Sequence, residues 1–404
     1  MPKDSANRQI FYGWFIVAAS LVISIALGGF LGTFGVFFKP IETEFGWSRT
    51  VVSSGFTALC LGYAVSIVVT GRLADRYSPR PILILSAILS GIGLTLSGGI
   101  HNVTEFRLLL FLAGLGGGAN WSVPMSTIQR WFHNRPRAGL ALSIAIAGIG
   151  IGALVFAPLI NSFILSYGWR KAYPVFGGIF FAAIAISAIF MRRSPTSPTG
   201  ADESDAGLKP PVSREWTTRE VIVTPAFLIL TFVFCVGDLS YAVVSVHLVP
   251  HAIDVGISAT VAAAALGLFG GFSVPGRLGA GPLSDRMSWE KVLVVSAFGM
   301  AASMFLLIFL KNTVMLYAFV LLEGVFSGLR VPVQVGLMAK YFGTRSLGTL
   351  IGITGAAMVF LEAVAPYAAG FTFDTTGSYF WAFMSLVVLL VSAGILAKVV
   401  KKPV

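Results

Sequence analysis

The segment GRLADRYSPRP at residues 71–81 follows an apolar run, and a similar segment, GPLSDR, stands 210 positions later at residues 281–286. At the same offset, RWFHNR at residues 130–135 matches KYFGTR at residues 340–345. Two independent landmarks at one spacing predict that the chain consists of two duplicated units. Each landmark is a short basic connector between apolar runs, so each unit is predicted to be a bundle of membrane helices.

Apolar residues dominate the composition. The 404 residues are 56% hydrophobic and 11% charged, whereas a soluble protein carries about twice that charged fraction. No soluble core could hide so much apolar surface, so the outer surface is predicted to face lipid. The net charge of +11 sits in short connectors and not in a basic domain, which argues against nucleic-acid binding. Cys60 and Cys235 lie in separate apolar runs and are interpreted as packing residues.

Apolar runs long enough to cross a bilayer, which takes about 20 residues, predict twelve helices. The predicted spans cover residues 12–38, 50–70, 81–100, 107–131, 138–164, 172–191, 223–249, 258–280, 292–310, 315–340, 347–371 and 379–399. Residues 192–220 are rich in Pro, Ser and acidic residues and are predicted to be a cytoplasmic linker between domains 1–191 and 221–404. The predicted fold class is an all-α membrane protein of twelve transmembrane helices in two pseudo-symmetric six-helix bundles.

The distribution of lysine and arginine predicts the orientation of the chain. With a cytoplasmic N-terminus, 20 of the 28 basic residues lie in inside segments, and two, Arg277 and Arg330, fall within spans. The outside loops hold the remaining six, namely Lys39, Arg49, Arg107, Arg170, Lys171 and Lys311. This asymmetry follows the positive-inside rule. Both termini are therefore predicted to be cytoplasmic, in a bacterial inner membrane.

Several short motifs indicate a family. Residues 71–81 resemble the signature between helices two and three of the major facilitator superfamily. The motifs YGW (12–14), FGWSR (45–49), RAGLA (137–141) and FDTTGSY (373–379) together resemble the monocarboxylate transporter family and its bacterial oxalate/formate antiporter relatives. The resemblance covers nearly the whole chain except the linker. It implies the major facilitator fold and a secondary carrier that works by alternating access.

The repeated loops are candidate gating elements. Their glycines would let helices approach closely at the cytoplasmic face, and their aspartates could accept hydrogen bonds from a helix N-terminus or pair with arginines. The resemblance assigns this loop to gating and not to substrate binding; the alternative is that it only anchors the topology. The candidate gating residues are Gly71, Asp75, Arg76, Gly281, Asp285 and Arg286.

Five ionisable residues fall within predicted spans: Asp238, Arg277, Glu323, Arg330 and Glu362. A charge at the bilayer centre costs about 3 kcal/mol or more, so these side chains are expected to face the interior or a water-filled cavity. Arg277 is the leading substrate-binding candidate, because a guanidinium pairs bidentately with a carboxylate and stays charged when buried. The resemblance places the family's substrate-binding arginine at this position. The alternative is a structural ion pair with Glu362 or Asp238.

Arg330 corresponds to Asn120 at the 210-residue offset, and the resemblance places both in cavity-lining spans. Both are candidate substrate contacts, as is Tyr241. A polar stripe marks one helical face around Arg330, formed by Glu323, Ser327, Arg330 and Gln334. Arg330 is therefore assigned either to the substrate or to an ion pair with Glu323 or Glu362.

Asp238 and Glu362 are the candidate proton-coupling residues, because a desolvated carboxylate could exchange protons near neutral pH. Many animal monocarboxylate transporters carry an aspartate four residues before the arginine, where this chain has Ser273. His247 and His251 are expected to be solvated near the outer end of the seventh span. Glycines in the first span, among them Gly28, allow either close helix packing or backbone approach to substrate.

Together these features predict a non-enzymatic carrier that moves a small organic anion, such as a monocarboxylate, with protons. An exchanger of dicarboxylate against monocarboxylate, of the oxalate/formate type, is the alternative mechanism. A membrane sensor that kept the fold and lost transport is the alternative from another class. The chain contains no phosphate-binding loop for ATP and no metal-binding histidine motif. The expected partners are the anion, protons and the bilayer, with no cofactor and no obligate protein partner.

Overall fold

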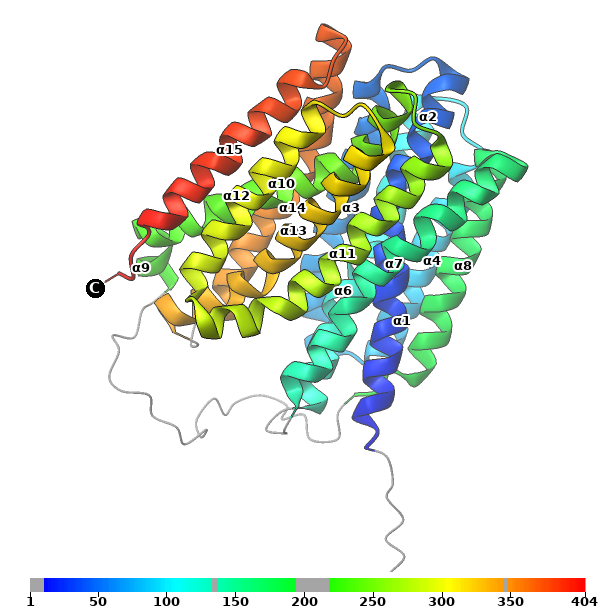
Figure 1. The fold of residues 1–404 in the computed structure, drawn as a ribbon. Coiled ribbons are helices and arrows are strands. Elements are labelled where there is room, and N and C mark those ends of the chain that lie inside the picture. The colour runs from blue at the N-terminus through cyan, green and yellow to red at the C-terminus, as the bar shows by residue number, and fades with distance from the viewer. Residues whose placement is uncertain (1–10, 133–136, 194–217, 344–346, 404) are drawn as a thin grey trace, which may run out of the picture.

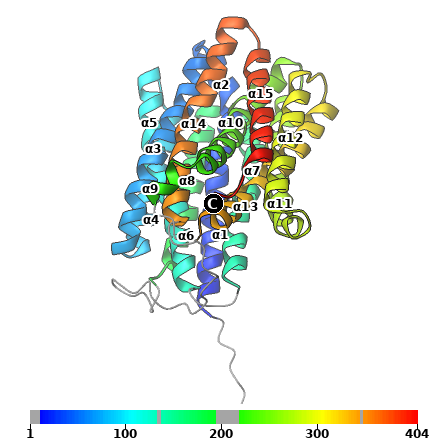
Figure 2. The same ribbon diagram turned by 90° about the vertical axis from the view of Figure 1, so that its left-hand side faces the viewer.

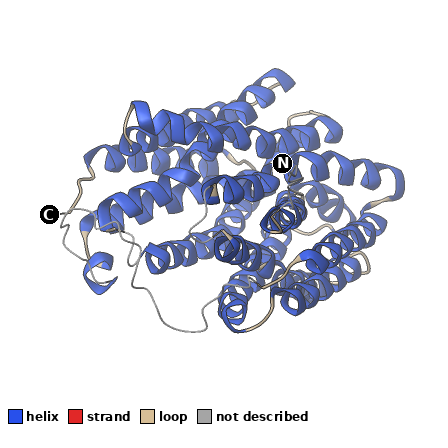
Figure 3. Cartoon of the chain, turned by 90° about the horizontal axis from the view of Figure 1, so that it is seen from below, coloured by secondary structure: helices blue, strands red, loops and turns tan. Residues whose placement is uncertain are grey.

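The computed structural model describes residues 11–132, 137–193, 218–343 and 347–403 (Figure 1). Throughout this part of the chain the regular secondary structure is helical (Figure 3). The helices are α1 (Gly13–Gly32), α2 (Phe34–Phe45), α3 (Arg49–Arg76), α4 (Pro79–Ser97), α5 (Val103–Gly117), α6 (Ala119–Trp131), α7 (Ala138–Tyr167), α8 (Trp169–Phe190), α9 (Thr218–Ile222), α10 (Pro225–Asp254), α11 (Ala259–Arg286), α12 (Trp289–Ile308), α13 (Thr313–Phe342), α14 (Leu347–Thr376) and α15 (Phe380–Val399).

Twelve helical segments within the described residues are long and apolar enough to cross a membrane, which confirms the predicted span count. Two of them consist of two helices in line, because α1 and α2 meet at Thr33 and α5 and α6 meet at Gly118. Several helices extend past the predicted apolar ends. The repeated segments at residues 71–76 and 281–286 are the last turns of α3 and α11, since polar side chains there can face water while the backbone remains helical.

The helices form two groups, an N-terminal half (α1–α8) and a C-terminal half (α10–α15). Within the first half α1 packs along α7, and within the second α11 packs along α13. Gly28 is required for the first of these contacts, because a Cβ there would lie 2.0 Å from the Ile149 carbonyl oxygen. The packing interpretation of Gly28 is therefore confirmed.

Individual hydrogen bonds repeat between the halves at the 210-residue offset. Asn102 and Asn312 each cap a helix by accepting a backbone N–H from three residues further on, both at 2.9 Å. Ser86 and Ser296 each donate to a backbone carbonyl 30 residues later, at 2.6 and 2.7 Å. The predicted duplication is thus present at the level of single side chains.

The two halves meet along α3–α14 and α7–α11, and also between α2 and α10 (Figures 1 and 2). We call the end of the molecule that holds Gly13 and Val399 the inner end, and the opposite end the outer end. In Figure 1 the halves converge toward the outer end, at the top, and diverge toward the inner end. An added Cβ at Gly71, Gly281 or Gly352, near the inner ends of their helices, would meet no atom within 4 Å. The two halves therefore lie closer together at the outer end than at the inner end.

Candidate functional site

Arg330 on α13 forms an ion pair with Asp238 on α10, inside the C-terminal half. Its Nη1 also donates to the Phe234 carbonyl oxygen at 2.9 Å, and both charged side chains are buried. Gly237 makes room for the guanidinium, because a Cβ there would lie 2.4 Å from Arg330 Nε. The sequence assigned Arg330 either to the substrate or to an ion pair with Glu323 or Glu362. Its observed counter-ion is Asp238, which the sequence could not select because helix rotation about α10 sets the pairing.

Glu323 is fully buried and makes no ion pair within the described residues. Ser240 donates to its Oε1 at 2.7 Å, and Ser303 contacts its Oε2. These hydroxyls come from α10 and α12, so the carboxyl group lies among helices of its own half. Its position on the polar face of α13 is as predicted, but its contacts are local to the C-terminal half.

Arg277 on α11 lies at the seam between the halves. Its Nη1 donates to the carbonyl oxygen of Ile146 on α7 at 3.2 Å, and its buried Nε has no hydrogen-bond partner in the described part. No described carboxylate forms an ion pair with it. Tyr241, Arg330 and Asp238 lie close enough to act on it electrostatically, although Asp238 is ion-paired with Arg330. A guanidinium held this way is a cation without a counter-ion, which a low-dielectric site tolerates poorly.

Glu362 on α14 is half-buried and has neither a hydrogen bond nor an ion pair among the described residues. Asp238 and Arg330 interact with it electrostatically, as does Tyr241. We call Asp238, Tyr241, Arg277, Arg330 and Glu362 the central cluster. Counting only ion pairs between described residues, it contains one neutralised pair (Arg330–Asp238), one unpaired cation (Arg277) and one unpaired carboxyl group (Glu362).

Asn120 on α6 is fully buried in the N-terminal half. Its Oδ1 lies 3.0 Å from the Ser86 hydroxyl on α4, and its Nδ2 has no partner in the described structure. The side chain is thus directed toward α4, and no described contact joins it to the central cluster. Its role in substrate binding stays a prediction.

The predicted gating residues lie at the inner ends of α3 and α11, apart from the other half. Asp285 and Arg286 are exposed, and no ion pair involves them in the part of the chain described. Asp75 is within α3, but its side chain lies outside what the structure describes. Gly71 and Gly281 face open space. Their gating role therefore stays a prediction for a conformation in which the inner end is closed.

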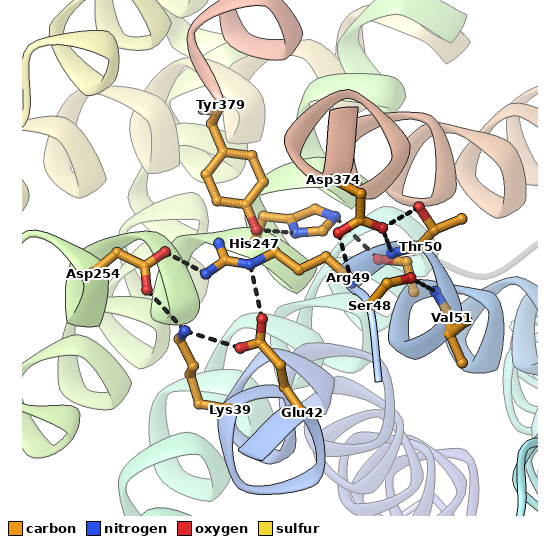
Figure 4. Close-up of polar contacts among 11 residues, drawn as sticks. Lys39, Glu42, Ser48, Arg49, Thr50, Val51, His247, Asp254, Asp374 and Tyr379 are labelled. Carbon is orange, nitrogen blue, oxygen red and sulfur yellow. Dashed lines mark hydrogen bonds and ion pairs between the residues drawn. The ribbon is translucent and has the colours of Figure 1, made fainter. Parts of the chain in front are cut away.

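A second group of polar residues joins the halves at the outer end (Figure 4). We call it the outer cluster, and its members are Lys39, Glu42, Arg49, Thr50, Asp254 and Asp374. Arg49 is buried at its centre, with Nε 3.0 Å from Glu42 and Nη2 2.5 Å from Asp254. Its guanidinium also stacks 3.6 Å from the Phe373 ring centroid.

Sequence reasoning missed the outer cluster as a site. A signal was present, because the motifs at residues 45–49 and 373–379 both contribute to it. Arg49 is assigned to an outside loop by the sequence, and Asp374 lies in the short segment before the last predicted span, so neither is marked as part of a site by a position inside an apolar run. Their contact joins residues 325 positions apart, and only the packing of α3 on α14 brings them together.

His247 lies beneath the outer cluster and is fully buried, so the expectation of a solvated histidine was wrong. Its Nε2 lies 2.8 Å from the Pro366 carbonyl oxygen, and its Nδ1 lies 2.8 Å from the Tyr379 hydroxyl. Because a carbonyl can only accept, Nε2 carries the proton and Nδ1 accepts from Tyr379. Burial raises the pKa of the Tyr379 phenol above its usual range, so this donor remains protonated.

Comparison with known proteins agrees with this architecture. The model of the family described as Major Facilitator Superfamily matches residues 16–313 and 230–404. Monocarboxylate transporter 12 of Rattus norvegicus is 25% identical over 430 residues, which cover 97% of this chain and 86% of that protein. The uncharacterized MFS-type transporter YhjX of Escherichia coli (strain K12) is 25% identical over 350 residues, covering 84% and 83%.

A solved structure also shares the fold. It is a bacterial homolog of the human lysosomal transporter Spinster in an inward-facing, occupied conformation. The TM-score is 0.77 at 15% identity, with 97% of each chain covered.

The described residues form twelve helical segments able to cross a membrane, in two similar halves, and this architecture is that of a multi-pass membrane transporter. The family model spans most of the sequence, and the chain belongs to the Major Facilitator Superfamily. The predicted family and fold class are confirmed, and the chain is a transporter and not an enzyme.

Proposed function

We propose that the chain carries a small organic anion with a single carboxylate across a bacterial inner membrane, together with a proton. The observation that supports this most directly is Arg277, a half-buried guanidinium at the seam whose buried Nε has no hydrogen-bond partner and which forms no ion pair among the described residues. A carboxylate bound there would supply the missing charge and accept from the unpartnered Nε. Because Arg277 also contacts α7 of the other half, a ligand at this position is in contact with both halves.

Glu362 is the proposed proton carrier. Asp238 is occupied by Arg330, so protonating it would break a buried ion pair, which typically costs 3 to 5 kcal/mol, on the order of a thousandfold in equilibrium. Glu362 forms no such pair within the described part of the chain. A neutral Glu362 next to an anion on Arg277 leaves the central cluster electrically balanced, which favours movement of both through a low-dielectric seam.

The charge balance also bears on the exchanger. A dicarboxylate would need a second unpaired cation, and Arg330 is neutralised by Asp238. One unpaired guanidinium favours a monocarboxylate. The relatives named monocarboxylate transporter 12 and 13 are consistent with that substrate class.

Uptake of labelled small monocarboxylates into proteoliposomes, with and without an inward proton gradient, tests the proposal. Arg277→Ala should abolish uptake, and Arg277→Lys should restore part of it, because a lysine keeps the charge without the planar fork. Arg193→Ala, an exposed arginine outside the spans, is the matched control and should transport normally. Uptake by Arg277→Ala at the wild-type rate would contradict the anion site.

Glu362→Gln and Asp238→Asn distinguish the roles of the two carboxyl groups. The amide mimics the protonated carboxyl group, so it should lose gradient-driven accumulation while exchanging labelled for unlabelled anion across the membrane. Asp238→Asn should lose both activities, because it leaves Arg330 without its counter-ion. Full gradient-driven uptake by Glu362→Gln would remove Glu362 as the proton carrier, and uptake that needs an internal counter-anion would favour the exchanger.

A further inference from the structure

Two carboxylates of the C-terminal half hold the outer end of the N-terminal half. Asp374 accepts the backbone N–H of Arg49 at 2.9 Å and that of Thr50 at 2.8 Å, and the Thr50 hydroxyl donates to it at 2.5 Å (Figure 4). Asp254 binds Arg49 Nη2 at 2.5 Å and Lys39 Nζ at 2.8 Å. All five contacts cross from one half to the other.

Both acids stand where their own helices disfavour a negative charge. Asp254 is the last residue of α10, and Asp374 lies in the last turn of α14. The C-terminal end of a helix carries partial negative charge, so an aspartate there is unfavourable by about 0.3 to 1 kcal/mol. The helix to which each aspartate belongs therefore does not stabilise its negative charge. Asp254 is stabilised by Lys39 and Arg49 of the opposite half, and Asp374 by the N-terminal N–H groups of α3.

Helix α3 depends on this arrangement for its cap. The first N–H groups of a helix have no acceptor within it, and the N-cap Ser48 accepts only from Val51, at 3.4 Å. Asp374 accepts the N–H groups of Arg49 and Thr50, which Ser48 does not bind. By contrast, α5 and α13 are capped from their own half by Asn102 and Asn312.

We propose that Asp374 and Asp254 form the outer gate of this carrier. They hold the outer ends of the two halves together in this conformation, and they release α3 and its cations when the carrier opens outward. Glu42 makes the release reversible. It contacts Arg49 at 3.0 Å and Lys39 at 2.9 Å within its own half, so both cations keep a counter-ion after the halves part.

Distances between spin labels in the full-length protein, reconstituted in lipid nanodiscs, test the gate without any substrate. One label pair reports the outer end, at His101→Cys and Lys311→Cys, and another reports the inner end, at Ser78→Cys and Lys291→Cys, all exposed positions. The native cysteines are replaced by Cys60→Ser and Cys235→Ala. Asp374→Ala should lengthen the outer distances, shorten the inner ones, and lower the ratio of outer-closed to outer-open molecules about fivefold or more, the effect of losing a helix cap.

Asn312→Ala is the matched control, because it removes a helix cap in which the acceptor, Asn312, and the donor, the Met315 N–H, belong to the same half. It should leave both distance distributions unchanged. Thr50→Val removes only the hydroxyl bond and should shift them in the same direction as Asp374→Ala, by less. Adding Thr50→Val to Asp374→Ala should add nothing. Wild-type distributions in Asp374→Ala, or an equal shift in Asn312→Ala, would overturn the gate, and neither result depends on the anion or the proton.

Discussion

At the scale of single residues, the central cluster depends on the absence of a side chain at Gly237. Arg330 reaches Asp238 by lying across α10 at Gly237, where a Cβ would come within 2.4 Å of Nε and 2.5 Å of Cδ. The atoms it would meet include the stem of the arginine, which is itself buried. A larger residue at 237 therefore displaces the arginine from its counter-ion.

Gly237→Ala is expected to lower thermal stability and abolish transport, because a displaced Arg330 leaves a buried charge unpaired, at a cost of about 3 kcal/mol or more. Gly178→Ala makes the same change on α8, where an added Cβ would meet nothing within 4 Å. It should be neutral or slightly stabilising, because alanine favours helix by about 1 kcal/mol over glycine. Thermal unfolding in detergent, followed by uptake, compares the two. Equal behaviour of both variants would contradict the steric role of Gly237.

The sequence identified all four charged residues of the central cluster by type and location, but not by partner. A charge within an apolar run is visible in the sequence, and Arg277, Arg330, Asp238 and Glu362 were found that way. Which charges pair depends on helix rotation and on packing between distant segments. The Arg330–Asp238 pair and the hydroxyl partners of Glu323 therefore could not be predicted.

At the scale of helices, prediction was strongest where local chemistry decides. The number of spans and the duplication follow from apolar length and repeated motifs, and both are confirmed. The ends of α3, α11 and α14 were placed too early, because an apolar scan stops at the first charges whereas the backbone remains helical through them. The start of α3 is the opposite case, since its cap comes from another helix 325 residues away.

The cap at the start of α13 offers a local test of helix stability. Asn312→Ala removes the Oδ1 acceptor of the Met315 N–H, bonded at 2.9 Å. We expect it to lower the free energy of unfolding by about 1 kcal/mol, the usual effect of losing an asparagine cap. Asn102→Ala, at the equivalent place in the N-terminal half, should cost a similar amount. Thermal or denaturant unfolding measures both, and a large difference between them would contradict the equivalence of the two halves.

At the scale of the whole molecule, the side of the membrane that each end faces is tied to the predicted topology. With both termini in the cytoplasm, the end at which the two halves diverge faces the cytoplasm. Gly281→Cys, at the inner end of α11, should react with a membrane-impermeant thiol reagent only in inside-out vesicles, and Lys311→Cys only in right-side-out vesicles. Labelling in a background without Cys60 and Cys235 checks this. The reverse pattern would invert the topology, and with it the names of the two ends.

The two halves contribute different residues to the outer cluster, so one half cannot replace the other. Ser48 and Ser258 begin α3 and α11 in the same way, with side chains that accept N–H groups at 3.4 Å. Yet Ser48 is followed by Arg49 and Ser258 by Ala259, and the last turns of α7 (residues 161–167) hold no acid to match Asp374. A chimaera of two N-terminal halves would therefore have two copies of Arg49 and no aspartate facing them. A chimaera of two C-terminal halves would have two copies of Asp374 and no arginine facing them. The gene that encoded two identical copies could not have had this gate; it required the copies to diverge into complementary, non-interchangeable pieces.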